Sequence, residues 1–181
     1  MIPSKAARRY SAALLGFALE TKTLPRVLKD IEHVHQTIQH SRELVLFLRN
    51  PVIKADKKRE AIKQLFGKSV SAEVNAFFDL IAEKSRFNLI AGIMQAFIDA
   101  YRRHEGIELV QVFFAEQPEA EQLSRIKKAL EVKTGKTVEL ITKHKPGLIG
   151  GLVVKIDDTV IDGSVKHKLE QLQYLFFKAA I

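Results

Sequence analysis

Apolar residues recur at helical spacing through the first hundred positions of the chain. The clearest stretch runs from Leu89 to Tyr101, where apolar side chains follow one another every three or four residues and therefore share one face of a helix. Comparable stripes are separated by serines, prolines and glycines, which typically begin or end helices. The pattern predicts six helices before Gly106, beginning near Ser4, Thr23, Ser41, Asp56, Ser71 and Leu89.

The pattern changes after Gly106. Residues 107–114 are rich in valine, phenylalanine and isoleucine, which predicts a strand, and an amphipathic helix with acidic residues at its start follows and ends at Gly135. Three further segments bounded by turn residues predict a meander of three strands at 138–144, 152–156 and 159–161. A closing helix from Ser164 is expected to bury an apolar stripe made of Val165, Leu169, Leu172 and Phe176.

These two periodicities predict the fold class α+β. We expect an N-terminal six-helix bundle over residues 1–105. A small C-terminal α+β domain, with the order strand, helix, three-strand meander, helix, is expected over residues 106–181. No repeat or long linker separates the two, so the joint between them should be short.

The charge of the chain is concentrated in its helical half. The 181 residues include 29 Lys and Arg against 21 Asp and Glu, a formal charge of +8, and residues 1–105 hold 18 of the basic and 11 of the acidic groups. A basic run comprises Lys54, Lys57, Lys58, Arg59, Lys63 and Lys68. This run is the main argument for an alternative function, a basic helical nucleic-acid-binding adaptor. Acidic residues interrupt it and no aromatic residue is interleaved for base stacking, which favours a solvated helix surface.

The sequence offers no recognisable catalytic constellation. It contains no cysteine, and the paired Gly150 and Gly151 fit neither a phosphate-binding loop nor a dinucleotide fingerprint. His33, His35 and His40 are expected to be solvated surface residues, because no close pair completes a metal-ligand set. We therefore expect a protein that is not an enzyme and has no cofactor or metal. No apolar run approaches the roughly 18 to 20 residues of a membrane span.

Three motifs resemble one known family. Residues 7–14 have the sequence ARRYSAAL, residues 148–152 have LIGGL, and residues 160–165 have VIDGSV. They are similar to motifs of the δ subunit of bacterial F-type ATP synthases and its mitochondrial counterpart, the oligomycin-sensitivity-conferring protein. The most specific motif residues are Gly150, Gly151, Asp162, Gly163 and Ser164. Two departures are Ser11, where alanine is usual, and Lys145-Pro146-Gly147, where Asp-Pro-Ser is common.

The resemblance implies a stator subunit in the peripheral stalk of an F-type ATP synthase. Such a subunit links the catalytic head to the b-subunit stalk and resists rotational torque during proton-driven ATP synthesis. The resemblance also implies a peripheral location on the cytoplasmic side of the bacterial inner membrane, with membrane contact only through the complex and no nucleic acid as a partner.

Two sets of partner contacts follow from the resemblance. In this family the first and fifth helices form a groove for the N-terminal helix of an α subunit, which implies contacts at Tyr10, Ala13, Leu14, Phe77 and Leu80. The same positions could instead belong to the core of the bundle. The C-terminal domain is implied to hold the C-terminus of the b subunit, and the contacts expected there are Tyr174 and Phe177.

Overall fold

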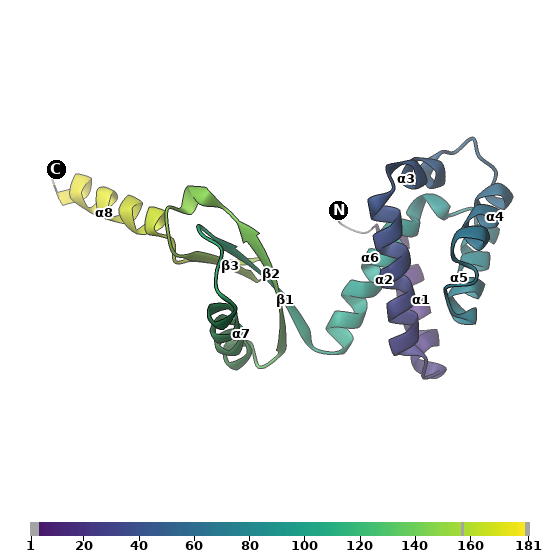
Figure 1. Ribbon diagram of the computed structural model, residues 1–181, viewed down its shortest axis with the longest axis horizontal. Coiled ribbons are helices and arrows are strands. Elements are labelled where there is room, and N and C mark those ends of the chain that lie inside the picture. Colours follow the sequence, from purple (N-terminus) through teal and green to yellow (C-terminus); the bar gives the residue numbers. More distant parts are fainter. Residues whose placement is uncertain (1–3, 157, 180–181) are drawn as a thin grey trace. The chain divides into compact units, whose positions relative to one another are not determined.

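The computed structural model describes residues 4–156 and 158–179 and divides the chain into two compact units. The first unit is Met1–Tyr101 and the second is Arg102–Ile181. The division falls a few residues before the sequence-based limit at 105, inside the last helix of the first half. The fold is mixed α+β: the described residues form eight α-helices and one four-stranded sheet (Figure 1).

The first unit consists of helices. Their bounds are α1 (Lys5–Glu20), α2 (Leu24–His40), α3 (Arg42–Arg49), α4 (Ala55–Phe66), α5 (Ala72–Glu83), a 3-10 turn η1 (Phe87–Leu89) and α6 (Ile90–His104). Side-chain caps are present at two of the expected starts, Ser4 and Ser41, whereas Thr23 and Ser71 precede their helices without a side-chain capping hydrogen bond. The Ser4 hydroxyl accepts a hydrogen bond from the Ala7 amide at 3.2 Å, and the Ser41 hydroxyl accepts one from Leu44 at 3.2 Å.

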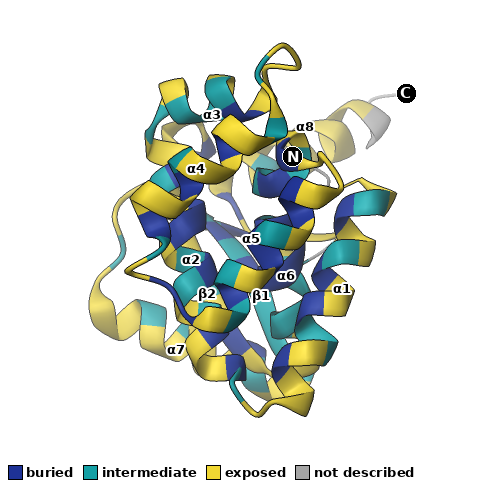
Figure 2. Cartoon of the chain, turned by 90° about the vertical axis from the view of Figure 1, so that its right-hand side faces the viewer, coloured by how far each residue is buried: buried dark blue, intermediate teal, exposed yellow. Residues whose placement is uncertain are grey.

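The apolar stripes of these helices meet in one continuous core. Ile93, Met94 and Phe97 of α6 are fully buried, and side chains from every other α-helix of the unit join them. Figure 2 shows the buried positions on the inward sides of the helices. Burying a large apolar side chain contributes roughly 1.5–3 kcal/mol, so this shared core is the main source of stability. The predicted helical periodicity is confirmed here.

The start of α4 differs from the sequence-based expectation. Asp56 lies inside the first turn rather than at the cap, because α4 begins at Ala55 with Lys54 before it. Gly67 follows the helix with φ −55°, in the ordinary right-handed region. Leu65 is 56% exposed, whereas Ile62 and Phe66 of the same helix are buried.

Lys58 on α4 is the clearest departure from a solvated basic surface. Its side chain is only 6% exposed. Its ammonium donates hydrogen bonds to the carbonyl oxygens of Leu48, at 2.8 Å, and Asn50, at 2.7 Å, at the C-terminal end of α3. Burial lowers the pKa of Lys58. This cation therefore satisfies helix-end carbonyls and ties α4 to α3.

The second unit is built on a mixed sheet. Its elements are β1 (Ile107–Phe114), α7 (Ala120–Thr134), β2 (Thr137–His144), a 3-10 turn η2 (Pro146–Leu148), β3 (Leu152–Ile156), β4 (Thr159–Asp162) and α8 (Val165–Ala179). The strand order is β2-β1-β3-β4. β1 pairs in parallel with β2 and antiparallel with β3, and β3 pairs antiparallel with β4.

The predicted three-strand meander is wrong, because β1 lies between β2 and β3. The helical connection through α7 returns the chain parallel to β1, which leaves the other edge of β1 for β3. Val110 and Val112 of β1 are fully buried, and the inner position gives this apolar strand a partner on both sides. Only the β3–β4 hairpin keeps the expected pairing of neighbours in sequence.

The expected packing of the closing helix is also wrong. The stripe along α8 is exposed, by 40% at Val165, 52% at Leu169, 51% at Leu172 and 74% at Phe176. The apolar sheet face formed by Val110, Val112, Val138 and Val154 is already covered by α7 through Leu130, Leu123 and Ile126. Helix α8 therefore does not cover this apolar face of the sheet.

Candidate binding surfaces

The five residues expected to form a groove on the first and fifth helices fall into two groups. Leu14 of α1 and Phe77 of α5 are buried in the core, with 3% and 6% of their surface exposed. Ala13 is exposed and Leu80 is 39% exposed, while Tyr10 is partly buried and packs against the core. Tyr10, Ala13 and Leu80 are thus accessible to a partner, and Leu14 and Phe77 lie beneath the surface.

Tyr10 lies close to the end of α5. The pKa of Lys84, directly after α5, is raised by its 2.9 Å hydrogen bond to Glu83, and the Tyr10 phenol adds a smaller effect of the same sign. Leu14 of α1 and Phe77 of α5 also belong to the same buried core. The Arg9 guanidinium lies 5.8 Å from the centre of the Tyr10 ring, so a cation also flanks this ring.

Phe17 is an accessible residue that sequence reasoning did not select. It is 45% exposed and lies two helical turns after Tyr10, on the side of α1 that also carries Ala13. The i, i+3, i+7 spacing of Tyr10, Ala13 and Phe17 is the signal that could have identified it. An apolar ring exposed at this spacing extends the accessible apolar surface of α1.

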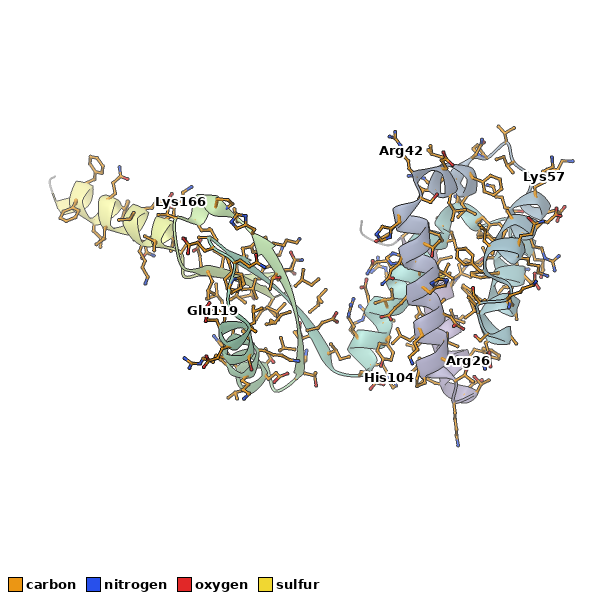
Figure 3. All side chains as sticks on the ribbon, viewed as in Figure 1. Arg26, Arg42, Lys57, His104, Glu119 and Lys166 are labelled. Atoms are coloured by element: carbon orange, nitrogen blue, oxygen red, sulfur yellow. The ribbon has the colours of Figure 1, made fainter. Side chains whose placement is uncertain are left out.

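The basic run around α4 carries less accessible charge than its sequence suggests. Lys58 is buried, and Asp79 of α5 binds Arg59 at 2.6 Å and Lys63 at 3.1 Å. The hydrogen bond from Arg59 lowers the pKa of Asp79. Lys57 extends from the outer side of α4 (Figure 3). Three of the six cations are therefore engaged within the protein, which weakens the case for a phosphate-binding surface.

Of the three histidines that were expected to be solvated, His33, His35 and His40, one is not on the surface. His35 is 8% exposed and its Nε2 atom lies 3.1 Å from the Gln39 amide nitrogen, so the expectation of a solvated side chain is wrong for it. Burial on the inner side of α2 lowers its pKa, against a smaller opposing effect of Asp99. His33 and His40 are not buried. Within residues 4–156 and 158–179, no three His, Cys, Asp or Glu side chains gather as metal ligands.

The glycine motifs join the sheet to α8. Gly151 has φ +74°, and a Cβ atom at this position would lie 2.4 Å from the Gly163 carbonyl oxygen. The Val165 amide donates to the Gly150 carbonyl at 3.0 Å, and the Gly163 amide donates to the Leu152 carbonyl at 2.9 Å. The two motif blocks are therefore fastened to each other by backbone contacts that leave no room for side chains.

Asp162 and Ser164 complete this junction. The Ser164 amide donates to the Asp162 carboxylate at 2.8 Å, and the Ser164 hydroxyl accepts from the His167 amide at 3.1 Å. Hydrogen bonding from Ser164 lowers the pKa of Asp162. Ser164 is 1% exposed, so the first residues of α8 are held by a buried and hydrogen-bonded serine.

Helix α8 presents apolar side chains along an accessible surface. Val165, Leu169, Leu172 and Phe176 follow a spacing of four, three and four residues, which is the seam of a coiled coil. Tyr174 and Phe177 are 66% and 65% exposed and lie on other sides of the helix. Beyond its first turn, where Lys166 is labelled, α8 extends away from the sheet in Figure 3. Such an unpartnered apolar helix indicates a protein-binding surface.

Both units expose apolar side chains along helices, a feature typical of protein-binding surfaces. None of the described helices is long and apolar enough to cross a membrane. A family model described as "ATP synthase delta (OSCP) subunit" matches residues 6–176. The chain belongs to this family.

Relatives and a solved structure agree with this assignment. The chain is 36% identical over 169 residues to ATP synthase subunit delta of Chlorobaculum tepidum, covering 93% of each chain. It is 36% identical over 173 residues to the subunit of the same name from Halothermothrix orenii, covering 96% of this chain and 91% of the relative. A chain in the cryo-EM structure of the Toxoplasma gondii mitochondrial ATP synthase hexamer superposes with a TM-score of 0.75 at 23% identity, covering 96% of this chain and 98% of that chain. This last likeness shows a shared fold.

Proposed function

We propose that the chain is the delta subunit of an F-type ATP synthase and serves as a stator in its peripheral stalk. The observation that carries this proposal is the family match over residues 6–176, which includes both units and their exposed apolar helices. The subunit performs no reaction of its own. It connects the catalytic head to the b-subunit stalk on the cytoplasmic side of the bacterial inner membrane, and it meets the membrane only through the complex.

The test of this function is the coupling of ATP hydrolysis to proton transport. Inner-membrane vesicles of the source organism that lack this chain should hydrolyse ATP without acidifying their interior, because the catalytic head would turn with the central shaft. Addition of the purified chain should restore acidification, followed with a pH-sensitive dye. Full proton pumping in vesicles without the chain would refute a stator role.

We assign binding of the head to the N-terminal unit, a six-helix bundle over residues 1–105. The N-terminal helix of an α subunit would lie along α1 and α5 and contact Tyr10, Ala13 and Leu80. An amphipathic helix binds an apolar surface through anchors at i, i+3, i+4 and i+7 of its own sequence, and Tyr10, Ala13 and Phe17 give α1 an accessible apolar surface for such anchors. Leu14 and Phe77 would support the surface from the core.

Leu80→Asp should weaken binding of this helix. A charge in the centre of an apolar contact is expected to reduce affinity by about 30-fold, the size of an interface hot spot. Isothermal titration of the full chain with a peptide copying the α-subunit N-terminus of the same organism measures the effect. Leu65→Asp is the matched control, because Leu65 is 56% exposed on α4, outside the proposed contact. Equal affinities of the two variants would remove α5 from the site.

We assign binding of the b subunit to the C-terminal unit, residues 106–181, through α8. The coiled-coil seam of Val165, Leu169, Leu172 and Phe176 suits a helical partner. Lys168 flanks this seam near its start, and Lys166 is paired with Glu170 at 3.8 Å, so the partner should carry an acidic residue beside its own apolar seam on the side of Lys168. Tyr174 and Phe177 would extend the contact around the helix.

A further inference from the structure

Three polar residues lie along one side of α5, starting at its N-cap. Ser71, Asn75 and Asp79 are each four residues apart, so they occupy successive turns on the same side of the helix. Beside them runs the apolar stripe that α5 buries in the core: Val74, Phe77, Phe78 and Ile81. Each of the three polar residues is bonded to a group outside α5, and the partners come from three different segments of the first unit.

The first bond comes from α2. The Ser71 amide donates to the Asp30 carboxylate at 2.7 Å. In a capping box this acceptor would be a polar side chain three residues into the helix, but Val74 occupies that position. Asp30 therefore supplies from another helix the acceptor that α5 lacks, at the positive end of the helix dipole. Ser71 is 2% exposed, so without Asp30 its amide would lose its acceptor in a buried position.

The second set of bonds ties α5 to the segment before it. The Asn75 side-chain nitrogen donates to the carbonyl oxygens of Gly67 at 3.1 Å, Val70 at 3.4 Å and Ser71 at 3.2 Å. Gly67 directly follows α4, and Ser71 directly precedes α5. One side chain thus holds the whole connection between α4 and α5 against the first turns of α5.

The third set of bonds connects α5 to α4, which lies beside it (Figure 1). The Oδ1 atom of Asp79 accepts a hydrogen bond from Arg59 at 2.6 Å and lies 3.1 Å from the Lys63 ammonium. Arg59 and Lys63 are one turn apart on α4, so two cations hold one carboxylate between them. A single exposed ion pair contributes little, but this network fixes the side of α5 that faces α4.

These bonds matter for the surface of α5 that is free to meet a partner. Leu80 follows Asp79 directly, but the helical period places it on the other side of α5 from Ser71 and Asn75. A turn of α5 about its axis would therefore move Leu80. Apolar burial is non-directional and resists such a turn weakly, whereas hydrogen bonds require a defined geometry.

We propose that Asp30, Asn75 and Asp79 are positioning residues, which fix the rotation of α5 and so hold Leu80 where the α-subunit helix would contact it. This inference rests on the proposed function of that surface, and it adds residues that do not themselves touch the partner. It also gives part of the basic run an internal role, because Arg59 and Lys63 act as anchors for α5.

Isothermal titration of the full chain with the α-subunit peptide tests the effect on binding. Asp30→Ala should weaken binding about fivefold, whereas Asp30→Asn keeps an acceptor oxygen and should stay within about twofold of the unmodified chain. Asp79→Ala should weaken binding about threefold. The titrations are made well below the melting temperature of each variant, so that lower stability alone would leave the affinity unchanged.

The matched control is Glu121→Ala. It also removes an ion-paired carboxylate, but the partner of Glu121 is Arg125 on the same helix, α7, at 2.6 Å. No second helix is held by this pair. Glu121→Ala should therefore leave the affinity for the peptide unchanged.

A measurement without any partner separates this inference from the proposed function. The chain contains no cysteine, so Ala13→Cys and Leu80→Cys together provide two unique sites for spin labels on α1 and α5. Both positions are exposed. Pulsed electron paramagnetic resonance should give a narrow distribution of distances between the labels. Adding Asp30→Ala or Asp79→Ala should shift or broaden it, and adding Glu121→Ala should not.

The possible results are distinguishable. Unchanged label distances in both Asp30→Ala and Asp79→Ala would overturn the inference, whether or not the peptide binds. Unchanged peptide affinity in both variants would overturn it as well. Equal weakening by Asp30→Ala and Asp30→Asn would contradict the role of the bond to Ser71. Changed distances in a chain that binds no peptide would support the fixed rotation of α5 and refute the proposed contact with the α subunit instead.

Discussion

Gly151→Ala is expected to destabilise the C-terminal unit by about 3 kcal/mol or more. Two effects add at this position. The residue has φ +74°, which an alanine adopts only with strain, and the new Cβ atom would lie 2.4 Å from the Gly163 carbonyl oxygen. Backbone on both sides of the contact is held by the hydrogen bonds of Gly163 and Val165, so neither segment can move away cheaply. A small domain has only about 5–15 kcal/mol of stability to lose.

Hydrogen exchange measures this effect where it should occur. Amide protection of β1 and β3 should fall in Gly151→Ala, while protection of α6 in the first unit should remain. Gly135→Ala is the matched control: Gly135 has φ +67°, but nothing lies within 4 Å of the place that an added Cβ atom would take, so only the backbone strain of about 1 kcal/mol applies. Equal loss of protection in the two variants would mean that the contact with Gly163 is not what requires glycine at 151.

The helices of the first unit could be predicted because the sequence signals that define each helix lie within that helix or next to it. Stripes such as Ile93, Met94 and Phe97 recur with the helical period, and their burial follows from that period alone. The cap at Ser4 is equally local, since its partner is three residues away. The environment of Lys58 is not local, because its two acceptors lie eight and ten residues away, at the end of another helix. A basic run was therefore predicted as surface although one of its members is buried.

The order of the strands could not be predicted for a related reason. Alternation within 138–144 and 152–156 indicates strands but does not specify their neighbours. Pairing of β1 with β3 joins residues far apart in sequence, such as Val112 and Val154. Neighbouring segments were expected to pair, and the connection through α7 made a different pairing possible.

The candidate binding residues could be placed on helix faces but not sorted by exposure. Leu14 and Ala13 are adjacent, yet one is buried in the core and the other is exposed. The sequence likewise showed that α8 is amphipathic, but an apolar stripe has the same pattern whether it covers its own sheet or awaits another protein. The structure distinguishes the two possibilities for α8, because α7 covers the apolar face of the sheet and the stripe of α8 is left exposed.

Leu172→Glu is expected to abolish most of the binding between this chain and the b subunit. Leu172 is at an inner position of the α8 seam, where a coiled-coil partner would surround its side chain, and a carboxylate buried there without a counter-ion should reduce affinity by about 100-fold. The side chain is 51% exposed in the free chain, so the folded subunit should keep its stability to within about 0.5 kcal/mol. Sedimentation of the full chain with the soluble C-terminal part of the b subunit measures the affinity.

Gln171→Glu is the control that separates the seam from charge alone. It adds the same negative charge to the adjacent position of α8, but Gln171 is off the seam and exposed, so binding should remain within a few-fold of the unmodified chain. Tyr174→Ala identifies the side of the helix in contact, because Tyr174 lies away from the seam. If Tyr174→Ala weakens binding and Leu172→Glu does not, the b subunit contacts the opposite side of α8. If none of the three variants weakens it, α8 does not bind the stalk, and its apolar surface serves a different partner.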